Sequence, residues 1–186
     1  MKRSYFKEEQ KFDQWWFRLI IITSFVAVIG IFAWGIIQQM VLKKPWGDHP
    51  TSDTVLLLTA VFVFIVMACA TWLTFTMRLI TEVTEAGLRY SFPPLMNKVR
   101  TIPKEVIAEY EVRKYNPMGE YGGWGIRSGQ FRKGKAYNVK GNTGLQLRLA
   151  DNKKILFGTQ RPDALKAAMD KMMRPPESQV ETGYGQ

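Results

Sequence analysis

Two uncharged stretches decide the architecture of this chain: LIIITSFVAVIGIFAWGIIQQMVL at residues 19–42 and TVLLLTAVFVFIVMACATWLTFTM at residues 54–77. About 20 apolar residues in a helix span the ~30 Å hydrocarbon core of a bilayer, so each stretch is long enough to cross it. Only eleven residues separate the two stretches. The pattern predicts two antiparallel transmembrane helices, at residues 18–42 and 54–78, joined by an external loop at residues 43–53.

The distribution of Lys and Arg predicts the orientation of this pair. Five basic residues precede the first stretch, two lie in the loop, and several follow the second stretch, beginning with Arg78. Basic residues accumulate on the cytoplasmic side of membrane proteins. We therefore expect a multi-pass protein of the plasma (inner) membrane with both termini in the cytoplasm.

Aromatic residues mark the ends of the predicted first helix. Trp15 and Trp16 precede it and Trp46 follows it, where tryptophan side chains anchor helices at the level of the lipid headgroups. Before them, aromatic residues recur among Lys and Glu at a spacing close to that of a helix. Residues 1–17 are therefore predicted to form an amphipathic segment, a short helix that lies on the inner membrane surface. The alternative is a frayed terminus.

Beyond Met77 the hydrophobic period changes to two, which is typical of strands. Alternating segments begin near Leu79, Leu88, Val106, Ala136, Leu145 and Lys154, and Glu85-Ala86-Gly87 reads as a tight hairpin turn. From Pro162 the spacing of Leu and Met is that of an amphipathic helix. The soluble domain is thus predicted to be mainly β and to extend over residues 79–174. The polar residues 175–186 are predicted to be a disordered tail.

The order of about seven short strands followed by one helix resembles the pleckstrin-homology-like (PH-like) fold, a bent β-sandwich or barrel capped by a C-terminal α-helix. LITEVTEAGLRYSF (79–92), TIPKEVIAEYEVRKY (101–115) and GTQRPDALKAAM (158–169) carry this resemblance. Together with the two apolar stretches, the chain resembles bacterial two-span membrane proteins that carry a cytoplasmic bacterial PH-like domain. The resemblance implies a fold and a location, and it implies no particular activity.

The segment Glu120 to Arg127 is the most unusual part of the soluble half, because three glycines surround one Trp. Glycine lets a partner approach the backbone closely. One interpretation is a recognition loop in which Tyr121, Trp124 and Arg127 contact a protein partner. The alternative is a glycine-kinked strand at a bend of the sheet, with Trp124 in the core.

A basic cluster follows this segment and is a candidate contact for anionic lipid. Its members are Arg132, Lys133, Lys135 and Lys140. Each such charge near an anionic membrane surface contributes about 1 kcal/mol to binding. The alternative is a solvated hairpin. The first hairpin turn, by contrast, is short and acidic, which argues against specific phosphoinositide binding there.

Catalysis finds little support in the sequence. The single His49 and single Cys69 lie in the membrane half, so they exclude a Ser/His/Asp or Cys/His set and make a zinc site improbable. Glu109 and Glu111 share a strand face with Arg113 and form a conceivable carboxylate pair, but a solvated face is the simpler interpretation. No metal, no cofactor and no nucleic-acid partner is expected.

These observations predict a non-catalytic, membrane-anchored binding or scaffolding protein. It would present its domain to a protein partner or to the inner membrane surface. The alternative is an accessory subunit of a larger membrane complex, whose apolar helices pack against other helices. A membrane-associated enzyme that uses Glu109, Glu111 or Glu120 is the third and least favoured hypothesis.

Overall fold

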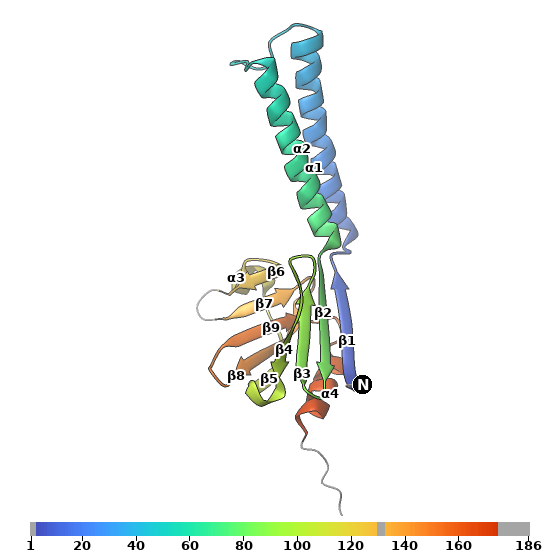
Figure 1. Ribbon diagram of the computed structural model, residues 1–186, viewed down its shortest axis with the longest axis vertical. Coiled ribbons are helices and arrows are strands. Elements are labelled where there is room, and N and C mark those ends of the chain that lie inside the picture. Colours follow the sequence, from blue (N-terminus) through green and yellow to red (C-terminus); the bar gives the residue numbers. More distant parts are fainter. Residues whose placement is uncertain (1–2, 130–132, 175–186) are drawn as a thin grey trace, which may run out of the picture. The chain divides into compact units, whose positions relative to one another are not determined.

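The computed structural model describes residues 3–129 and 133–174 (Figure 1). The chain divides into two compact units. One is a helical hairpin, residues Phe12–Met77, and the other is a β domain built from Met1–Lys11 together with Arg78–Gln186. The tail predicted to be disordered, at residues 175–186, lies outside the described residues.

The hairpin consists of α1 (Trp15–Ile36), a π-helical turn η1 (Ile37–Val41) and α2 (Asp53–Thr76). Both helices are apolar on all sides, and few of their residues are buried in the chain alone. By length and composition both are able to cross a membrane. They contact each other through Phe25 and Phe64, whose ring centroids are 5.7 Å apart. The prediction of two spanning-length helices is confirmed to this extent.

The three predicted anchors occupy the two ends of α1. Trp15 and Trp16 form its first turn, and the side chain of Trp15 is 75% exposed. Trp46, in the loop between the helices, folds back over Gly35, where a Cβ atom would lie 2.7 Å from the indole ring. Glycine at position 35 therefore makes room for this ring.

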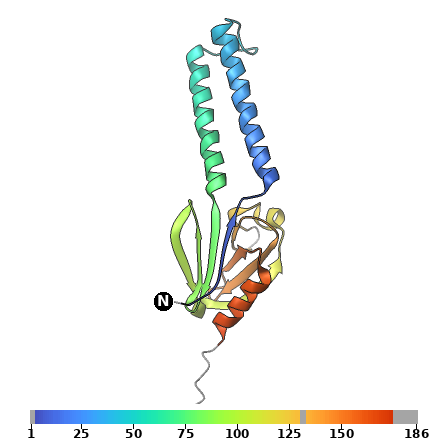
Figure 2. The same ribbon diagram turned by 90° about the vertical axis from the view of Figure 1, so that its right-hand side faces the viewer.

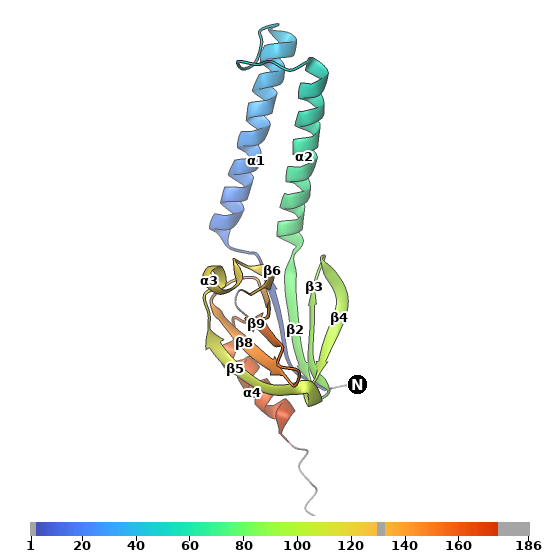
Figure 3. The same ribbon diagram turned by 90° about the vertical axis from the view of Figure 1, so that its left-hand side faces the viewer.

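The first sheet has four antiparallel strands in the order β1-β2-β3-β4 (Figure 3). They are β1 (Ser4–Lys11), β2 (Arg78–Thr84), β3 (Gly87–Phe92) and β4 (Met96–Pro103). The turn predicted at Glu85-Ala86-Gly87 is confirmed, because Thr84 pairs with Gly87. The strand β4 was not expected from the sequence.

The prediction of an amphipathic helix in residues 1–17 is wrong, because Ser4–Lys11 forms strand β1 and pairs with β2 along its length. The inward positions of β1 are Phe6, Glu8 and Gln10, all buried. Two of these three side chains are polar, so the strand lacks the alternation of apolar and polar residues that usually identifies one. Of the aromatic residues that suggested a helical face, only Tyr5 and Phe6 lie in the strand, on opposite sides of it.

The second sheet has five strands in the order β5-β8-β9-β7-β6. They are β5 (Ile107–Lys114), β6 (Gly125–Ser128), β7 (Lys135–Asn138), β8 (Thr143–Leu149) and β9 (Lys154–Gly158). All neighbours are antiparallel except β7 and β9, which are parallel. The two sheets are separate and do not close into a barrel. The structure thus confirms a mainly-β domain with a C-terminal helix, and the PH-like assignment goes beyond it.

The core forms where the two sheets face each other. Tyr90 of the first sheet contacts Tyr137 and Phe157 of the second, with ring centroids 4.9 and 4.8 Å apart. The C-terminal helix α4 (Pro162–Met173) buries Leu165, Met169 and two other side chains, as its amphipathic pattern predicts. It packs against β1, β2 and the second sheet (Figure 2).

Candidate functional site

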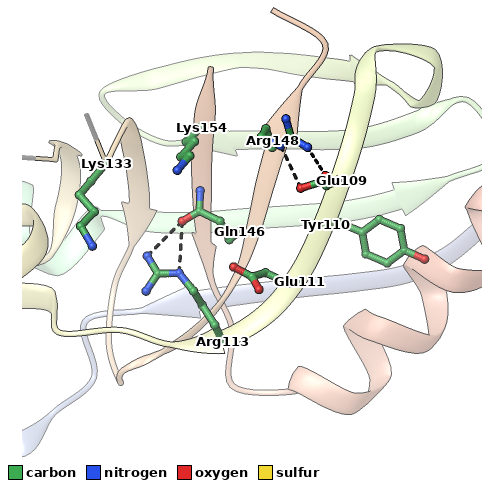
Figure 4. Close-up of a pocket in the computed structure, with 8 residues that line it drawn as sticks. All are labelled: Glu109, Tyr110, Glu111, Arg113, Lys133, Gln146, Arg148 and Lys154. Atoms are coloured by element: carbon green, nitrogen blue, oxygen red, sulfur yellow. Dashed lines mark hydrogen bonds and ion pairs between the residues drawn. The ribbon is translucent and has the colours of Figure 1, made fainter. Parts of the chain in front are cut away.

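The second sheet carries an open depression of about 640 Å³, which we call the polar hollow (Figure 4). Most of its lining side chains are charged, and they come from β5, β8, β9 and the segment before β7. They are Glu109, Tyr110, Glu111, Arg113, Lys133, Gln146, Arg148 and Lys154. Six of these eight side chains are charged, four of them cationic and two anionic.

Strand register explains why these residues meet. Glu109 lies opposite Arg148 and Glu111 opposite Gln146 in the β5–β8 ladder. Lys154 of β9 lies opposite Arg148. Because successive side chains of a strand alternate between faces, every second residue of three adjacent strands projects from the same face. The expectation that Glu109 and Glu111 share a face with Arg113 is confirmed.

The best-defined ion pair at the hollow joins Arg113 and Glu120. Two guanidinium nitrogens donate to the two carboxylate oxygens, at 3.2 and 2.9 Å. Lys133 adds a third cationic contact at 3.4 Å, and the backbone N–H of Asn116 donates to the same carboxylate at 3.0 Å. The hydrogen bond from Arg113 lowers the pKa of Glu120 to about 2. Glu120 is therefore ionised throughout the physiological pH range.

The same arginine holds the floor of the hollow. Its Nε and one terminal nitrogen donate to Oε1 of Gln146, at 3.4 and 3.1 Å. The hydroxyl of Tyr121 lies beside them, 3.4 Å from the guanidinium. A planar guanidinium that contacts a carboxylate and an amide together is fixed in orientation. The hollow is thus organised before any ligand arrives.

The other charges of the hollow differ in how they are paired. Arg148 donates to both carboxylate oxygens of the exposed Glu109, through Nε and one terminal nitrogen, and its other terminal nitrogen donates to Oδ1 of Asn152 at 3.2 Å. Glu111 and Lys154 make no hydrogen bond or ion pair to the described residues, and both side chains line the hollow (Figure 4). Among residues 3–129 and 133–174, Glu111 and Lys154 thus have opposite charges near them, Arg113 and Glu109 respectively, but no direct ion pair.

The glycine-rich segment begins at the end of a short capped helix, α3 (Pro117–Tyr121), and continues into strand β6 (Gly125–Ser128), so the strand alternative is confirmed from Gly125 onward. The side chain of Asn116 accepts a hydrogen bond from the N–H of Gly119 at the start of α3. At its end, Gly122 (φ +68°) and Gly123 donate to the carbonyls of Met118 and Pro117, which is a Schellman motif. The left-handed conformation at position 122 explains one of the glycines.

The three residues predicted to contact a partner are not brought together on an open surface. Tyr121 is 2% exposed and packs edge-on against Tyr115. Trp124 is half-buried, and its indole N–H donates to the carbonyl of Gly141 at 3.2 Å. Arg127 is exposed and donates to the carbonyl of Trp124 at 2.9 Å. Their contacts serve the local structure, and Trp124 is neither in the core nor free.

The predicted basic cluster is spread along one strand. Lys133 precedes β7 and pairs with Glu120, Lys135 is the exposed first residue of β7, and Lys140 follows the strand. The strand ends at Asn138, and Lys140 lies in the bend that follows it. Arg132 lies outside the described residues. Contact of these lysines with anionic lipid stays a prediction.

Sequence reasoning missed Gln146, Arg148 and Lys154. A signal was present, because Gln146 and Arg148 alternate with leucines in the clearest strand of the chain. The sequence does not show which strand pairs with β8. Only the β5–β8 register shows that Arg148 faces Glu109.

No protein-family model, no curated protein and no solved structure matches this chain. Within residues 3–129 and 133–174, no group of three His, Cys, Asp or Glu side chains is placed to hold a metal ion.

Proposed function

We propose that the protein is a non-catalytic, membrane-anchored binding protein whose β domain holds a protein partner in the polar hollow at the inner membrane surface. The observation that carries this proposal is the β1–β2 ladder. It joins the segment before α1 to the segment after α2, from the Ser4–Thr84 pair to the Lys11–Arg78 pair. Two crossings return the chain to the side from which it started, so a single domain built from both segments is what a spanning hairpin permits.

The polar hollow supports a binding role because its charges are fixed and of both signs. Arg113 and Glu120 stabilise the floor, and Glu111 and Lys154 are available to complementary charges of a partner. Paired charges across an interface favour specificity and association rate. Confinement beside the membrane raises the local concentration of both proteins, so a weak interface suffices.

Photo-crosslinking in native membranes tests this role. A photoreactive residue replaces Glu111 in the hollow, and a matched control replaces Lys7, which is exposed on β1. We expect a discrete crosslinked protein with the first variant and none with the second. Lys154→Glu, which reverses the neighbouring exposed charge of the hollow, should reduce capture from position 111. Equal capture from both positions would contradict a partner site in the hollow.

The recognition loop remains a separate hypothesis and needs its own variant. Trp124→Ala with Arg127→Ala removes two side chains outside the hollow. If the loop contacts the partner, this pair reduces capture from position 111 while the domain stays folded by hydrogen exchange. If the hollow alone binds, capture is unchanged.

The proposed orientation, with both termini cytoplasmic, follows from the excess of Lys and Arg outside the inter-helix loop. Single cysteines at Asp48 in that loop and at Asp151 in the β8–β9 turn test it in a Cys69→Ala background. A membrane-impermeant thiol reagent should label position 48 in intact cells, and position 151 only after permeabilisation. The reverse pattern would place the β domain outside.

A second candidate function is an accessory subunit of a larger membrane complex. A groove of about 270 Å³ between α1 and α2 favours it, because all twelve of its lining residues are apolar. Side chains of another helix fit such a groove as well as lipid tails do. Purification in mild detergent separates the candidates, since a stable subunit retains stoichiometric partners and a peripheral binding protein does not.

A further inference from the structure

The edge strand β4 is uncovered on both of its faces. All five residues from 97 to 101 are exposed, whereas one face of a strand in a two-sheet domain ordinarily packs on the core. Two of the exposed side chains on the β3–β4 hairpin are large and apolar, namely Leu95 at 56% and Val99 at 53% exposure. Exposed apolar residues that lie together mark surfaces that contact lipid or protein.

The composition of this hairpin distinguishes between those occupants. Residues 93–103 contain Lys98 and Arg100 and no Asp or Glu. Val99 lies between Lys98 and Arg100 in β4, and Leu95 lies in the turn before the strand, so exposed apolar and basic side chains are neighbours in the sequence of this hairpin. An apolar tip with basic residues behind it suits a layer of anionic headgroups, where alkyl groups are buried and cations stay at the surface.

The tip of the hairpin, residues 93–95, lies at the end of the first sheet where β2 begins and β1 ends. The N–H of Arg78 donates to the carbonyl of Pro93 at 3.0 Å, and Arg78 also pairs with Lys11. Pro93 is therefore beside the first residue of β2. Only Met77 separates this residue from α2, and three residues separate Lys11 from α1. The chain leaves the first sheet for both helices at the end that carries the tip.

We propose that the tip of the β3–β4 hairpin is a lipid-contact site in which Leu95 and Val99 enter the headgroup layer and Lys98 and Arg100 bind anionic headgroups. This inference rests on the proposed crossing of the membrane by α1 and α2. It adds a second attachment of the domain to the membrane, through a segment that the basic cluster at residues 132–140 does not include.

Single labels on the full-length chain in bilayer nanodiscs test the site, in a Cys69→Ala background. An environment-sensitive fluorophore is placed at Leu95→Cys, and its matched control is Glu85→Cys in the turn at the opposite end of β3. Six residues of strand separate the two turns, or about 20 Å. A third label at Val61→Cys in α2 reports whether the helices lie in lipid. Lipids that carry a nitroxide at headgroup depth quench whichever label they reach.

We expect several-fold stronger quenching and a blue-shifted emission at position 95 relative to position 85. Lys98→Glu with Arg100→Glu should reduce the quenching at position 95 in nanodiscs that contain anionic lipid. Quenching of the α2 label by lipids with a deep nitroxide, with none at position 95, would overturn the lipid-contact site and leave the anchored binding role intact. Absence of quenching at all three positions would overturn both proposals together.

Discussion

Two glutamates of the β domain, Glu8 and Glu120, are held by opposite kinds of partner. Glu8 is 8% exposed and accepts hydrogen bonds from neutral donors, the hydroxyl of Thr159 at 2.7 Å and the backbone N–H of Gln160 at 2.8 Å. Glu120 lies at the polar hollow and is held by two cations, Arg113 and Lys133. One carboxylate is a buried link and the other is part of an open network.

The difference lies in what each carboxylate connects. The partners of Glu8 are about 150 residues away in the sequence, because the helical hairpin and most of the β domain lie between them along the chain. Gln10, the next inward residue of β1, donates to the carbonyl of Gly158 at 2.6 Å and strengthens the same link. Glu120 contacts residues within its own region of the second sheet. The buried hydrogen bonds of Glu8 and Gln10 therefore join β1 to residues 158–160. The ion pairs of Glu120 instead hold Arg113 and Lys133 at the polar hollow.

The largest effect is expected at the buried link. Glu8→Ala leaves a buried hydroxyl and a backbone N–H without an acceptor, which costs about 3 kcal/mol of unfolding free energy. Lys7→Ala, on the exposed side of the same strand, is the matched control and should change stability by less than about 0.5 kcal/mol. Denaturant unfolding of the full-length protein in mild detergent measures both.

The location of the change sharpens this comparison. Hydrogen exchange should increase in β1 and in the β9–α4 junction together in Glu8→Ala, because the link joins them. Equal stability of the two variants would show that the hydrogen bonds of Glu8 contribute little and that the β1–β2 ladder alone holds the strand.

A smaller effect is expected at the open network. Glu120→Gln keeps the shape of the side chain but removes the charge that faces Arg113 and Lys133. Because solvent reaches the hollow, the loss should be about 1–2 kcal/mol, below the cost at Glu8. Met118→Gln, at a 63% exposed position of the same short helix, serves as the control. A loss as large as that of Glu8→Ala would show that the network also maintains the fold.

The ion pair of Glu120 also makes stability depend on pH. The pKa of Glu120 is lowered in the folded protein from its ordinary value of 4.5 to about 2, mainly by the hydrogen bond from Arg113. A lowered folded-state pKa contributes stability that is present above pH 4.5 and is lost as the pH falls toward 2. The stability difference between the parent and Glu120→Gln should therefore shrink over this interval. A difference that stays constant from pH 6 to pH 2 would contradict the ion pair.

The sequence predicted the elements whose patterns are local. The two charge-free stretches predicted helices α1 and α2, and the alternating leucines predicted strand β8. It missed β1 because Glu8 and Gln10 occupy inward positions, and their partners at residues 158–160 are distant. It missed β4 because residues exposed on both faces show no alternation. Glu109, Glu111 and Arg113 were recognised as one face, but the floor of the hollow required a strand register that no local pattern contains.

The smallest effect is expected where a carboxylate is open to water. Glu109 pairs with Arg148 across the β5–β8 ladder, and the geometry of this pair is as direct as that of Arg113 with Glu120. The side chain of Glu109 is 64% exposed, however, and solvent screens the attraction between the two charges. Glu109→Gln should therefore leave the unfolding midpoint unchanged within error, while the same change at Glu120 shifts it. If the two variants shifted the midpoint equally, burial would not be what separates the organised floor of the hollow from its rim.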